Sequence, residues 1–335
     1  MKHSTGEFVG RYAPSPTGQL HLGNLRTALV AWLQTRLEDG TFILRMDDLD
    51  QPRVKKGSAE RIIHDLKWMG LDWDMGPDKS ATKSSIDNTV CIQSQRTIHY
   101  QRAFQVLLDR GQLFPCRCSR KDIAQASSAP HHRDGKAVYP GTCRPSNPYF
   151  PSTTSRRKNN DLGNDPTSGV AWRFRVEPTD QAITFVDIVK NLQRQNLCQE
   201  VGDFVVKRKD GLFAYQLATV VDDGLMKVTD VVRGEDLIHS TARQIALFES
   251  LTFPVPRFWH LPLMLDDKNE PMSKRDGSQS LEDWMARNPS HRAENLIGQL
   301  AFSIGLIGRR DSLSSKELLG ELTPETLRNR LTAAG

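Results

Sequence analysis

A short segment rich in proline and glycine precedes a histidine that could bind phosphate. The run Pro14-Ser-Pro-Thr-Gly-Gln-Leu-His21-Leu-Gly23-Asn24 lies between a strand-like stretch and a helix-like one. Its two prolines and Gly18 predict a tight turn, at which the backbone can pass close to a ligand. His21 then stands at a helix N-terminus, where unpaired N–H groups and the helix dipole favour an anion. Gly23 leaves space for a flat base. We interpret the run as a nucleotide-binding turn, and a capped helix with an incidental histidine is the alternative.

Three of the five cysteines indicate a metal site. Cys116, Cys118 and Cys143 lie close together in a chain with few other thiols. The odd total argues against a disulfide framework, whereas structural zinc takes four ligands, mainly thiolates and imidazoles. From the residues alone, the fourth ligand is His131 or His132, and reduced cysteines without a metal are the alternative. The sequence therefore predicts a zinc site in a reducing compartment, and we expect the protein in the cytoplasm.

The composition is that of an ordinary globular chain. Of the 335 residues, 38% are hydrophobic and 25% are charged, which excludes collagen, a coiled coil and wholesale disorder. No apolar run approaches the ~20 residues that span a bilayer, and the first residues lack the apolar stretch of a signal peptide. The net charge of +5 is compatible with a polyanionic partner but does not establish one.

Alternating strands and helices must position these residues. Residues 7–12 and 41–46 have the apolar runs of strands, and 22–37 and 59–69 have the spacing of amphipathic helices. This alternation predicts an α/β fold in which helices wrap a parallel sheet. We also expect strands at 171–176 and 203–206, a helix at about 241–251, a surface loop or disordered insert at 144–169, and a small helical segment at 281–335.

Several motifs, in this order and spacing, resemble the class I aminoacyl-tRNA synthetases. His21-Leu-Gly-Asn24 matches the ATP-binding HIGH motif, and Met272-Ser-Lys-Arg275 matches the KMSKS loop, with Pro271 where the family has the first Lys. The glutamyl branch is matched by Arg45-Met-Asp-Asp-Leu-Asp50, Asp210-Gly-Leu-Phe-Ala-Tyr215-Gln-Leu-Ala, Val221-Asp-Asp223 and Val232-Arg-Gly-Glu-Asp236. The resemblance covers roughly residues 7–280. It implies a Rossmann-like, doubly wound parallel sheet with an inserted zinc-bearing subdomain and a small helical C-terminal segment.

The resemblance also implies a site for ATP and L-glutamate. ATP, accompanied by Mg²⁺, would be bound by His21, Gly23, Asn24 and Lys274. L-Glutamate would be bound by Arg11, Tyr12, Ala13, Pro14, Ser15, Asp47, Tyr215 and Arg233. The chemistry agrees, because glutamate carries two carboxylates, which Arg11 and Arg233 can bind as bidentate forks, and one ammonium, which suits Asp47. Adenylation of glutamate needs no protein nucleophile, only positioning and charge stabilisation.

A narrower resemblance concerns the metal site and the length of the chain. The Tyr-x-x-x-Cys spacing of Tyr139 and Cys143 resembles the glutamyl-queuosine tRNA(Asp) synthetases, which implies Tyr139 as the fourth ligand of one Zn²⁺ per chain. Only 61 residues follow Lys274, fewer than the ~100 residues of a further anticodon-binding domain. The resemblance therefore implies that glutamate is activated without tRNA and then transferred to queuosine at the wobble position of tRNA(Asp).

The resemblance divides the chain into four parts. We expect the first half of the catalytic domain at 1–110, the inserted subdomain at 111–200, the second half at 201–280, and a short helical segment without an anticodon-binding domain at 281–335. The expected partners are glutamate, ATP and the queuosine-containing anticodon stem-loop of tRNA(Asp), bound by a monomer that does not enter a membrane. Two alternatives remain: a glutamyl-tRNA synthetase core that charges the 3′ end of tRNA(Glu), and a non-catalytic module that binds glutamate or an adenylate.

Overall fold

The computed structural model describes residues 7–78, 91–119, 121–123, 138–146, 169–264 and 279–335. The strands are β1 Val9–Tyr12, β2 Thr41–Leu44, β3 Leu113–Cys116, β4 Ala171–Phe174, β5 Ile183–Asp187, β6 Asn191–Gln195, β7 Phe204–Lys207, β8 Asp230–Gly234 and β9 Arg257–Leu261. The α-helices are α1 Leu22–Leu37, α2 Ser58–Trp68, α3 Thr97–Asp109, α5 Leu197–Glu200, α6 Tyr215–Leu225, α7 Ile238–Ser250, α8 Leu281–Arg287, α9 Ala293–Ser303, α10 Ser315–Gly320 and α11 Pro324–Ala334. Short 3-10 helices are η1 Gln51–Arg53, η3 Gln93–Arg96 and η4 Glu235–Leu237.

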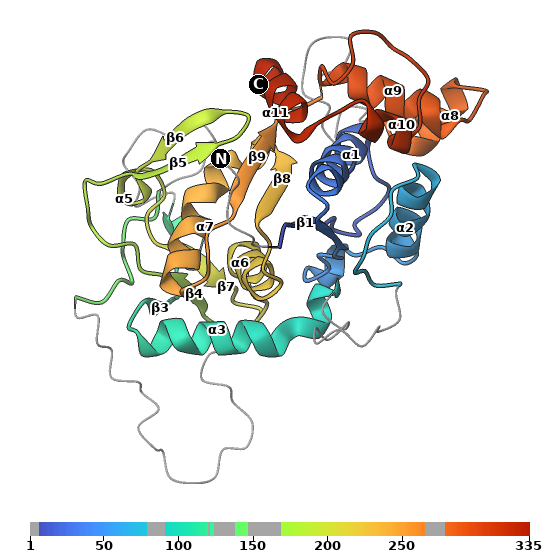
Figure 1. Cartoon of the computed structure of the whole chain (residues 1–335). Coiled ribbons are helices and arrows are strands. Elements are labelled where there is room, and N and C mark those ends of the chain that lie inside the picture. The colour runs from blue at the N-terminus through green and yellow to red at the C-terminus, as the bar shows by residue number, and fades with distance from the viewer. Residues whose placement is uncertain (1–6, 79–90, 120, 124–137, 147–168, 265–278) are drawn as a thin grey trace.

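A six-stranded sheet forms the centre of the molecule (Figure 1). Its strand order is β2-β1-β8-β9-β5-β6, and every pair is parallel except the β5–β6 hairpin. Parallel neighbours need crossover connections, which α1 provides between β1 and β2 and α7 between β8 and β9. This order places β1 beside β8, which comes more than two hundred residues later, so that distant segments meet inside the sheet.

The two faces of this sheet are covered by different helices. Successive side chains of a strand point to opposite faces: Phe42 and Leu44 pack with α1 and the C-terminal helices, whereas Ile43 packs with α3, α6 and α7. Neighbouring residues of β8 and β9 likewise point to opposite faces of the sheet and pack against one or the other of these two groups of helices. The predicted α/β fold with a largely parallel sheet is therefore confirmed.

A second, three-stranded antiparallel sheet has the order β3-β4-β7. The hairpin of β5 and β6 lies between β4 and β7 in the sequence, but it joins the large sheet through β9. The two sheets thus alternate along the chain between residues 171 and 207. The domain boundaries at 111, 201 and 281 stay a prediction, and most of the polar stretch at 144–169 lies outside the described residues.

In the last part of the chain, α9, α10 and α11 pack against α1 (Figure 1), and Trp284 of α8 packs against Trp68 of α2. Capping boxes begin α8, α10 and α11, in which an N-cap Ser or Thr and the residue three positions later satisfy each other's backbone N–H groups. Among the described residues, no helix is both long and apolar enough to cross a bilayer.

Candidate active site

A pocket of about 550 Å³ lies at the carboxyl ends of β1 and β8, the place where open α/β sheets bind ligands. Its lining contains all the predicted ATP- and glutamate-binding residues that the structure describes: Arg11, Tyr12, Ala13, Pro14, Ser15, His21, Gly23, Asn24, Asp47, Tyr215 and Arg233. Lys274, the remaining predicted residue, lies outside the described residues. Residues chosen from four separate motifs are thus brought together around one cavity.

His21 is the N-cap residue of α1, as predicted from the turn that precedes it. Its Nδ1 atom accepts a hydrogen bond of 3.3 Å from the backbone N–H of Asn24. In a neutral imidazole, Nε2 then carries the proton and is a donor. A Cβ atom added to Gly23 would lie 3.1 Å from two atoms of the His21 ring. The missing side chain of Gly23 therefore makes room for the imidazole itself, a role that the sequence analysis did not assign to it.

Arg11 reaches from β1 to a carboxylate on α6. Its Nε and Nη2 atoms lie 3.4 and 3.5 Å from the two carboxylate oxygens of Asp223, and Nη1 donates to the carbonyl oxygen of Val232 at 3.2 Å. Both side chains are buried. Burial opposes ionisation of Asp223, but Arg11 and Arg45 outweigh it and hold the pKa of this carboxyl below its usual range. The charge of Arg11 is therefore largely balanced within the protein.

Asp47 is held by Arg45, a fully buried arginine that follows β2. The Nε atom of Arg45 lies 2.7 Å from Asp47 Oδ1, and its Nη1 atom lies 2.7 Å from Asp223 Oδ1. Burial raises the pKa of Asp47 to about 6, against the attraction of Arg45 and with the added repulsion of Asp222 and Asp223. Asp47 thus faces the pocket with a carboxyl group whose pKa is raised by burial.

Asp222 completes this buried network. Its carboxylate accepts hydrogen bonds from Arg96 Nε at 2.5 Å, Gln93 Nε2 at 2.7 Å and the Tyr100 hydroxyl at 2.9 Å. Asp222 and Asp223 are neighbours on α6, and each binds arginines from other elements. These carboxylates and Arg45 belong to the sequence motifs named above, but no role was predicted for them. Adjacent acidic residues in a helix that is otherwise apolar were the available signal.

Arg233, which lines the pocket as Arg11 does, has a different set of partners. Its Nε donates to His260 Nε2 at 2.9 Å, Nη1 donates to Gln244 Oε1 at 2.7 Å, and Nη2 donates to Thr241 Oγ1 at 2.9 Å. The side chain is only 4% exposed, and burial lowers its pKa. Two of the five guanidinium N–H groups lie outside these three bonds, and the Tyr215 hydroxyl interacts with the same guanidinium. Tyr215, 41% exposed, stands at the mouth of the same pocket.

Three buried polar atoms of the pocket have no hydrogen-bond partner among the residues that the structure describes. They are Tyr12 Oη, Thr219 Oγ1 and Arg26 Nε. Buried polar atoms are rarely left unsatisfied in native proteins, so such atoms in a cavity indicate a polar ligand. Neither Thr219 nor Arg26 was predicted from the sequence. Thr219 stands four residues after Tyr215 on α6, and this helical spacing was the signal that could have found it.

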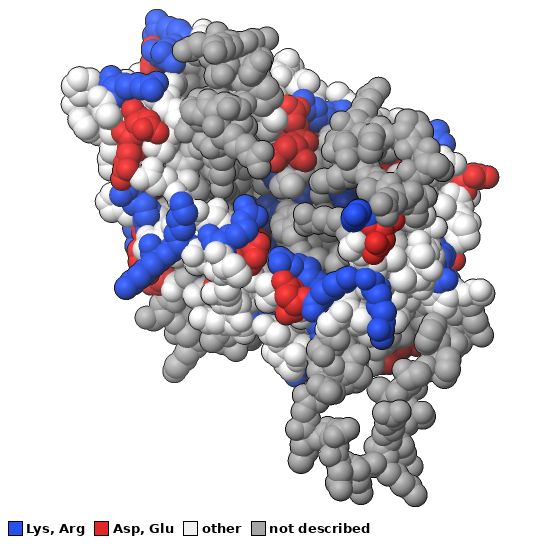
Figure 2. Space-filling model, turned by 180° about the vertical axis from the view of Figure 1, so that it is seen from behind, with Lys and Arg blue, Asp and Glu red and all other residues white. Residues whose placement is uncertain are grey.

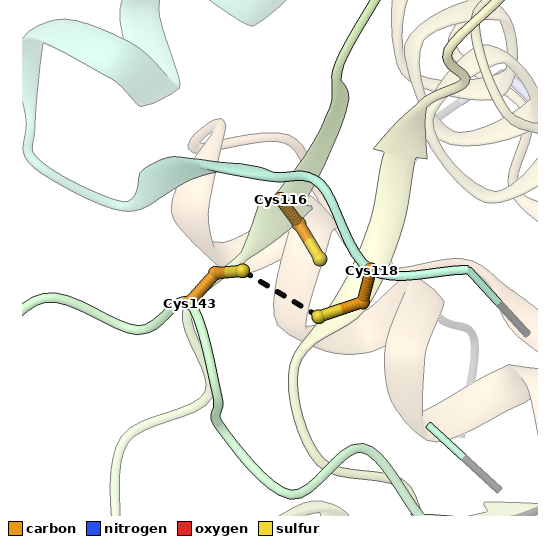
Figure 3. Close-up of side chains that lie close together, drawn as sticks. All are labelled: Cys116, Cys118 and Cys143. Carbon is orange, nitrogen blue, oxygen red and sulfur yellow. Dashed lines mark hydrogen bonds between the residues drawn. The ribbon is translucent and has the colours of Figure 1, made fainter. Parts of the chain in front are cut away.

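The three predicted cysteines converge at the end of β3 (Figure 3). The sulfur atoms of Cys116, Cys118 and Cys143 all lie within 4.8 Å of one another, and those of Cys118 and Cys143 are 3.5 Å apart. The hydroxyl oxygen of Tyr139 lies 3.5 Å from Cys116 Sγ and accepts a hydrogen bond of 2.8 Å from the backbone N–H of Cys143. Three thiols and one phenol therefore surround one point.

This arrangement fits a tetrahedral zinc ion, whose Zn–S bonds of ~2.3 Å place neighbouring sulfurs a little under ~4 Å apart. Burial alone would raise the pKa of the Cys116 thiol, but hydrogen bonds from Tyr139 and Arg173 outweigh it and lower this pKa to about 7. The Arg173 guanidinium also lies 3.7 Å from the centre of the Tyr139 ring. His131 and His132, the other candidate ligands, lie outside the described residues.

Comparison with known proteins identifies the family. Residues 7–324 match the catalytic domain of the class I tRNA synthetases (E and Q). The Glutamyl-Q tRNA(Asp) synthetase of Symbiobacterium thermophilum is 42% identical over 313 residues, which cover 93% of this chain and 91% of that relative. The Glutamyl-Q tRNA(Asp) synthetase of Nitratidesulfovibrio vulgaris is 40% identical over 321 residues, which cover 96% of this chain and 94% of the relative.

A solved structure adds a similarity of fold. The glutamate tRNA ligase of Elizabethkingia meningosepticum, crystallised in complex with its amino acid, superposes with a TM-score of 0.73 at 25% sequence identity. The match covers 96% of this chain and 66% of that one. By its match to the family model and by its identity to these relatives over most of their length, the chain is a class I tRNA synthetase, a ligase, and belongs to the glutamyl-Q tRNA(Asp) synthetase family.

Proposed function

We propose that this enzyme activates L-glutamate as glutamyl-adenylate without tRNA and then transfers the glutamate to queuosine at the wobble position of tRNA(Asp). The observation that carries the proposal is the pocket at the ends of β1 and β8. It combines a histidine at a helix N-terminus with a carboxylate and two arginines, all buried or half-buried. This is the set of groups that ATP and a dicarboxylic amino acid require together.

In the first step, an oxygen of the glutamate α-carboxylate attacks the α-phosphorus of ATP, and the bond from that phosphorus to pyrophosphate breaks. His21 Nε2–H and the backbone N–H groups at the start of α1 bind phosphate oxygens. Lys274 neutralises charge on the departing pyrophosphate, and Mg²⁺ enters with ATP. Positioning and electrostatic stabilisation account for the catalysis, since no protein group forms a covalent bond.

Glutamate is held by complementary charges. Asp47 binds the α-ammonium, and Arg233 binds a carboxylate through the N–H groups that its protein partners leave over. The charge of Arg11 is already balanced by Asp223, so Arg11 mainly orients the bound glutamate, whereas Arg233 supplies the positive charge that attracts its carboxylate. Ser15 and Tyr215 complete the wall of the amino-acid site. Thr219, whose buried hydroxyl lacks a described partner, is a further polar group on this wall.

In the second step, a hydroxyl group of the cyclopentenediol of queuosine attacks the carbonyl carbon of the adenylate. An ester forms, and AMP leaves. A polyanionic acceptor is supported by the basic surface: Lys and Arg side chains form a band across the middle of the face in Figure 2, interrupted by acidic groups. Such a surface suits RNA phosphates without reading a sequence.

Zinc has a structural role in this proposal. Cys116, Cys118, Tyr139 and Cys143 would hold one Zn²⁺, which supplies a cross-link between the end of β3 and the segment at 138–146. A closed four-ligand site of this kind stabilises a fold and leaves no position open for a substrate. The chain's own residues therefore carry out the adenylation in the separate pocket.

The test uses purified enzyme, glutamate and four RNA acceptors. ATP–pyrophosphate exchange should depend on glutamate and proceed without tRNA; its absence would favour a non-catalytic binding module. Radiolabelled glutamate should then pass to tRNA(Asp) that contains queuosine, even after removal of its 3′-terminal nucleotides. Transfer should disappear when the tRNA lacks queuosine. The similarity to a glutamate tRNA ligase makes tRNA(Glu) the necessary comparison. Efficient charging of tRNA(Glu), with loss of transfer on 3′ truncation, would contradict the proposal.

A further inference from the structure

A buried histidine and a buried aspartate stand behind Arg233, outside the lining of the pocket. His260 on β9 and Asp187 at the end of β5 are both fully buried, and His260 Nδ1 lies 2.6 Å from Asp187 Oδ2. The other oxygen of Asp187 accepts hydrogen bonds from the backbone N–H groups of Val189 at 3.0 Å and Lys190 at 2.8 Å. On its far side, His260 Nε2 accepts from Arg233 Nε at 2.9 Å. The three side chains form one line of hydrogen bonds that ends at the pocket.

The partners of His260 determine which nitrogen carries its proton. Asp187 is an acceptor on one side, so Nδ1 must be the donor there. Arg233 Nε can only donate, so Nε2 must be an unprotonated acceptor. A second proton on the ring would direct an N–H group at the guanidinium and place two cations side by side. Burial and the charge of Arg233 both lower the pKa of His260, in agreement with a neutral ring in the Nδ1–H form.

In this arrangement, the positive charge of Arg233 is not neutralised by a carboxylate in direct contact with it. Arg11 and Arg45 each bind a carboxylate directly, whereas the acceptors of Arg233 are a neutral imidazole, an amide and a hydroxyl. The imidazole of His260 lies between Arg233 and Asp187, so the width of the ring separates the Asp187 carboxylate from the guanidinium. Within the described chain, three hydrogen bonds thus fix Arg233 and the Tyr215 hydroxyl adds a further interaction, while no carboxylate forms an ion pair with it.

We propose that the Asp187–His260 pair is a positioning device that fixes Arg233 and leaves its charge for a carboxylate of glutamate. The inference rests on the proposed function, in which Arg233 binds that carboxylate. Neither His260 nor Asp187 touches the substrate. Their effect reaches the reaction through the orientation of the guanidinium, and it is expected in the affinity for glutamate rather than in the affinity for ATP.

Two substitutions at one position separate positioning from mere packing. In His260→Gln, the amide oxygen replaces Nε2, so the bond from Arg233 is kept while that to Asp187 is lost. In His260→Asn, the shorter amide replaces Nδ1, so the bond to Asp187 is kept while Arg233 loses its acceptor. Both variants remove the ring and should lose similar thermal stability. In ATP–pyrophosphate exchange, we expect His260→Asn to raise the KM for glutamate on the order of 10-fold to 100-fold, and His260→Gln to raise it much less. The KM for ATP should stay the same in both.

A structural role alone predicts equal KM values for glutamate in the two variants, and that result would overturn the proposal. A second measurement needs no variant: ¹⁵N spectra of histidine-labelled parent enzyme report which ring nitrogen is protonated. The ring signals of His260 are assigned through scalar couplings to its own backbone. We expect the ring to be in the neutral Nδ1–H form with and without glutamate. A doubly protonated ring, or the Nε2–H form, would also overturn the proposal.

Failure of the proposed function has its own signature. It would appear as parent enzyme without glutamate-dependent exchange, or as an Arg233→Ala variant with the parental KM for glutamate. Where the parent is active and Arg233→Ala is impaired, equal effects of the two His260 substitutions reject the positioning role alone.

Discussion

The carbonyl oxygen of Gln279 accepts a hydrogen bond of 3.1 Å from the backbone N–H of Leu22. Leu22 begins α1, directly after His21, and His21 itself pairs with Ser280 in a short antiparallel bridge. At the other end of the intervening segment, Met264 lines the pocket. The segment that contains Lys274 therefore begins beside the pocket, after Met264, and ends at the nucleotide-binding turn, before Gln279.

Lys274→Ala should lower the rate of glutamate adenylation by on the order of 10²-fold or more, with a smaller effect on glutamate affinity. Its ammonium is expected to act on charge that develops on the leaving pyrophosphate, and such contacts affect the rate more than ground-state binding. Single-turnover formation of the adenylate is the measurement. Lys268→Ala, in the same segment, is the matched control and should react nearly as the parent does. An unchanged rate for Lys274→Ala would remove this residue from the site.

Arg233→Ala should mainly weaken the binding of glutamate. A buried carboxylate that loses its charged partner costs ~2–5 kcal/mol of binding free energy. Isothermal calorimetry with glutamate measures the loss directly, and Arg194→Ala, an exposed arginine on β6, controls for the removal of a positive charge. Equal glutamate affinity in Arg233→Ala and parent would place this arginine outside the amino-acid site.

The affinity for glutamate should fall in mild acid. Burial raises the pKa of Asp47 to about 6, so below that pH the carboxylate becomes neutral and no longer attracts the α-ammonium. We expect the KM for glutamate to rise by up to about tenfold per pH unit on the acid side. In Asp47→Asn, the KM should be high already at neutral pH and should change little with pH. Burial also lowers the pKa of His260, so this residue titrates in acid as well. If Asp47→Asn keeps the full pH dependence of the KM for glutamate, a group other than Asp47 causes it.

The same titration has a consequence for stability, with a definite sign. The folded-state pKa of Asp47 lies above the ordinary value of 3.8, so folding favours the neutral form. Its stabilising contribution is fully present below the ordinary pKa and is lost as the pH rises through about 6. Thermal unfolding of the parent and of Asp47→Asn, followed between about pH 4 and about pH 7, should show a smaller pH dependence in the variant. A larger dependence in the variant would mean that Asp47 is stabilised as the carboxylate.

Tyr139→Phe tests the fourth ligand of the zinc site. The substitution keeps the ring beneath Arg173 and removes only the hydroxyl group that lies beside Cys116 and Cys143. Three thiolates remain, so we expect zinc to bind on the order of tenfold more weakly or worse, measured by competition with a chromogenic chelator. Cys198→Ser is the control, because Cys198 lies on α5 and outside the cluster. If Tyr139→Phe binds zinc as tightly as the parent does, His131 or His132 is the fourth zinc ligand instead of Tyr139.

Much of the fold follows from patterns in the sequence. The strand and helix predicted at 7–12 and 22–37 are β1 and α1, and the later pair at 41–46 and 59–69 corresponds to β2 and α2. The helix α2 has clear apolar periodicity, and β1, α1 and α2 are followed within a few residues by Pro14, Gly40 and Gly70, so local signals suffice for these elements. The hairpin of β5 and β6 was not predicted. Its outward face carries exposed Val186 and Leu192 beside polar residues, and this mixture gives no clean alternation.

The candidate site was predicted as a set of residues but not as a set of partnerships. The motifs were enough to select Arg11, Asp47 and Arg233, and all three line one pocket. Which of them is balanced by a carboxylate depends on α6 and β9, which are distant in the sequence. Only the sheet order that places β1 beside β8, and β8 beside β9, decides that Arg11 faces Asp223 while Arg233 faces a neutral ring.

Arg233 and His260 occupy matching positions in the register of β8 and β9, and this pairing constrains how the amino-acid specificity can change. An enzyme redesigned to accept an uncharged amino acid would have to give up Arg233. Doing so alone would take the charged donor away from the Nε2 lone pair of a fully buried imidazole and leave it only the Thr241 hydroxyl at 3.3 Å, at a penalty of ~1–3 kcal/mol. Adding an apolar side chain at 233 is therefore compatible with a stable core only when position 260 changes with it. Mutational libraries aimed at this pocket should randomise the two positions jointly, because single-site scans would discard each half of a viable double replacement.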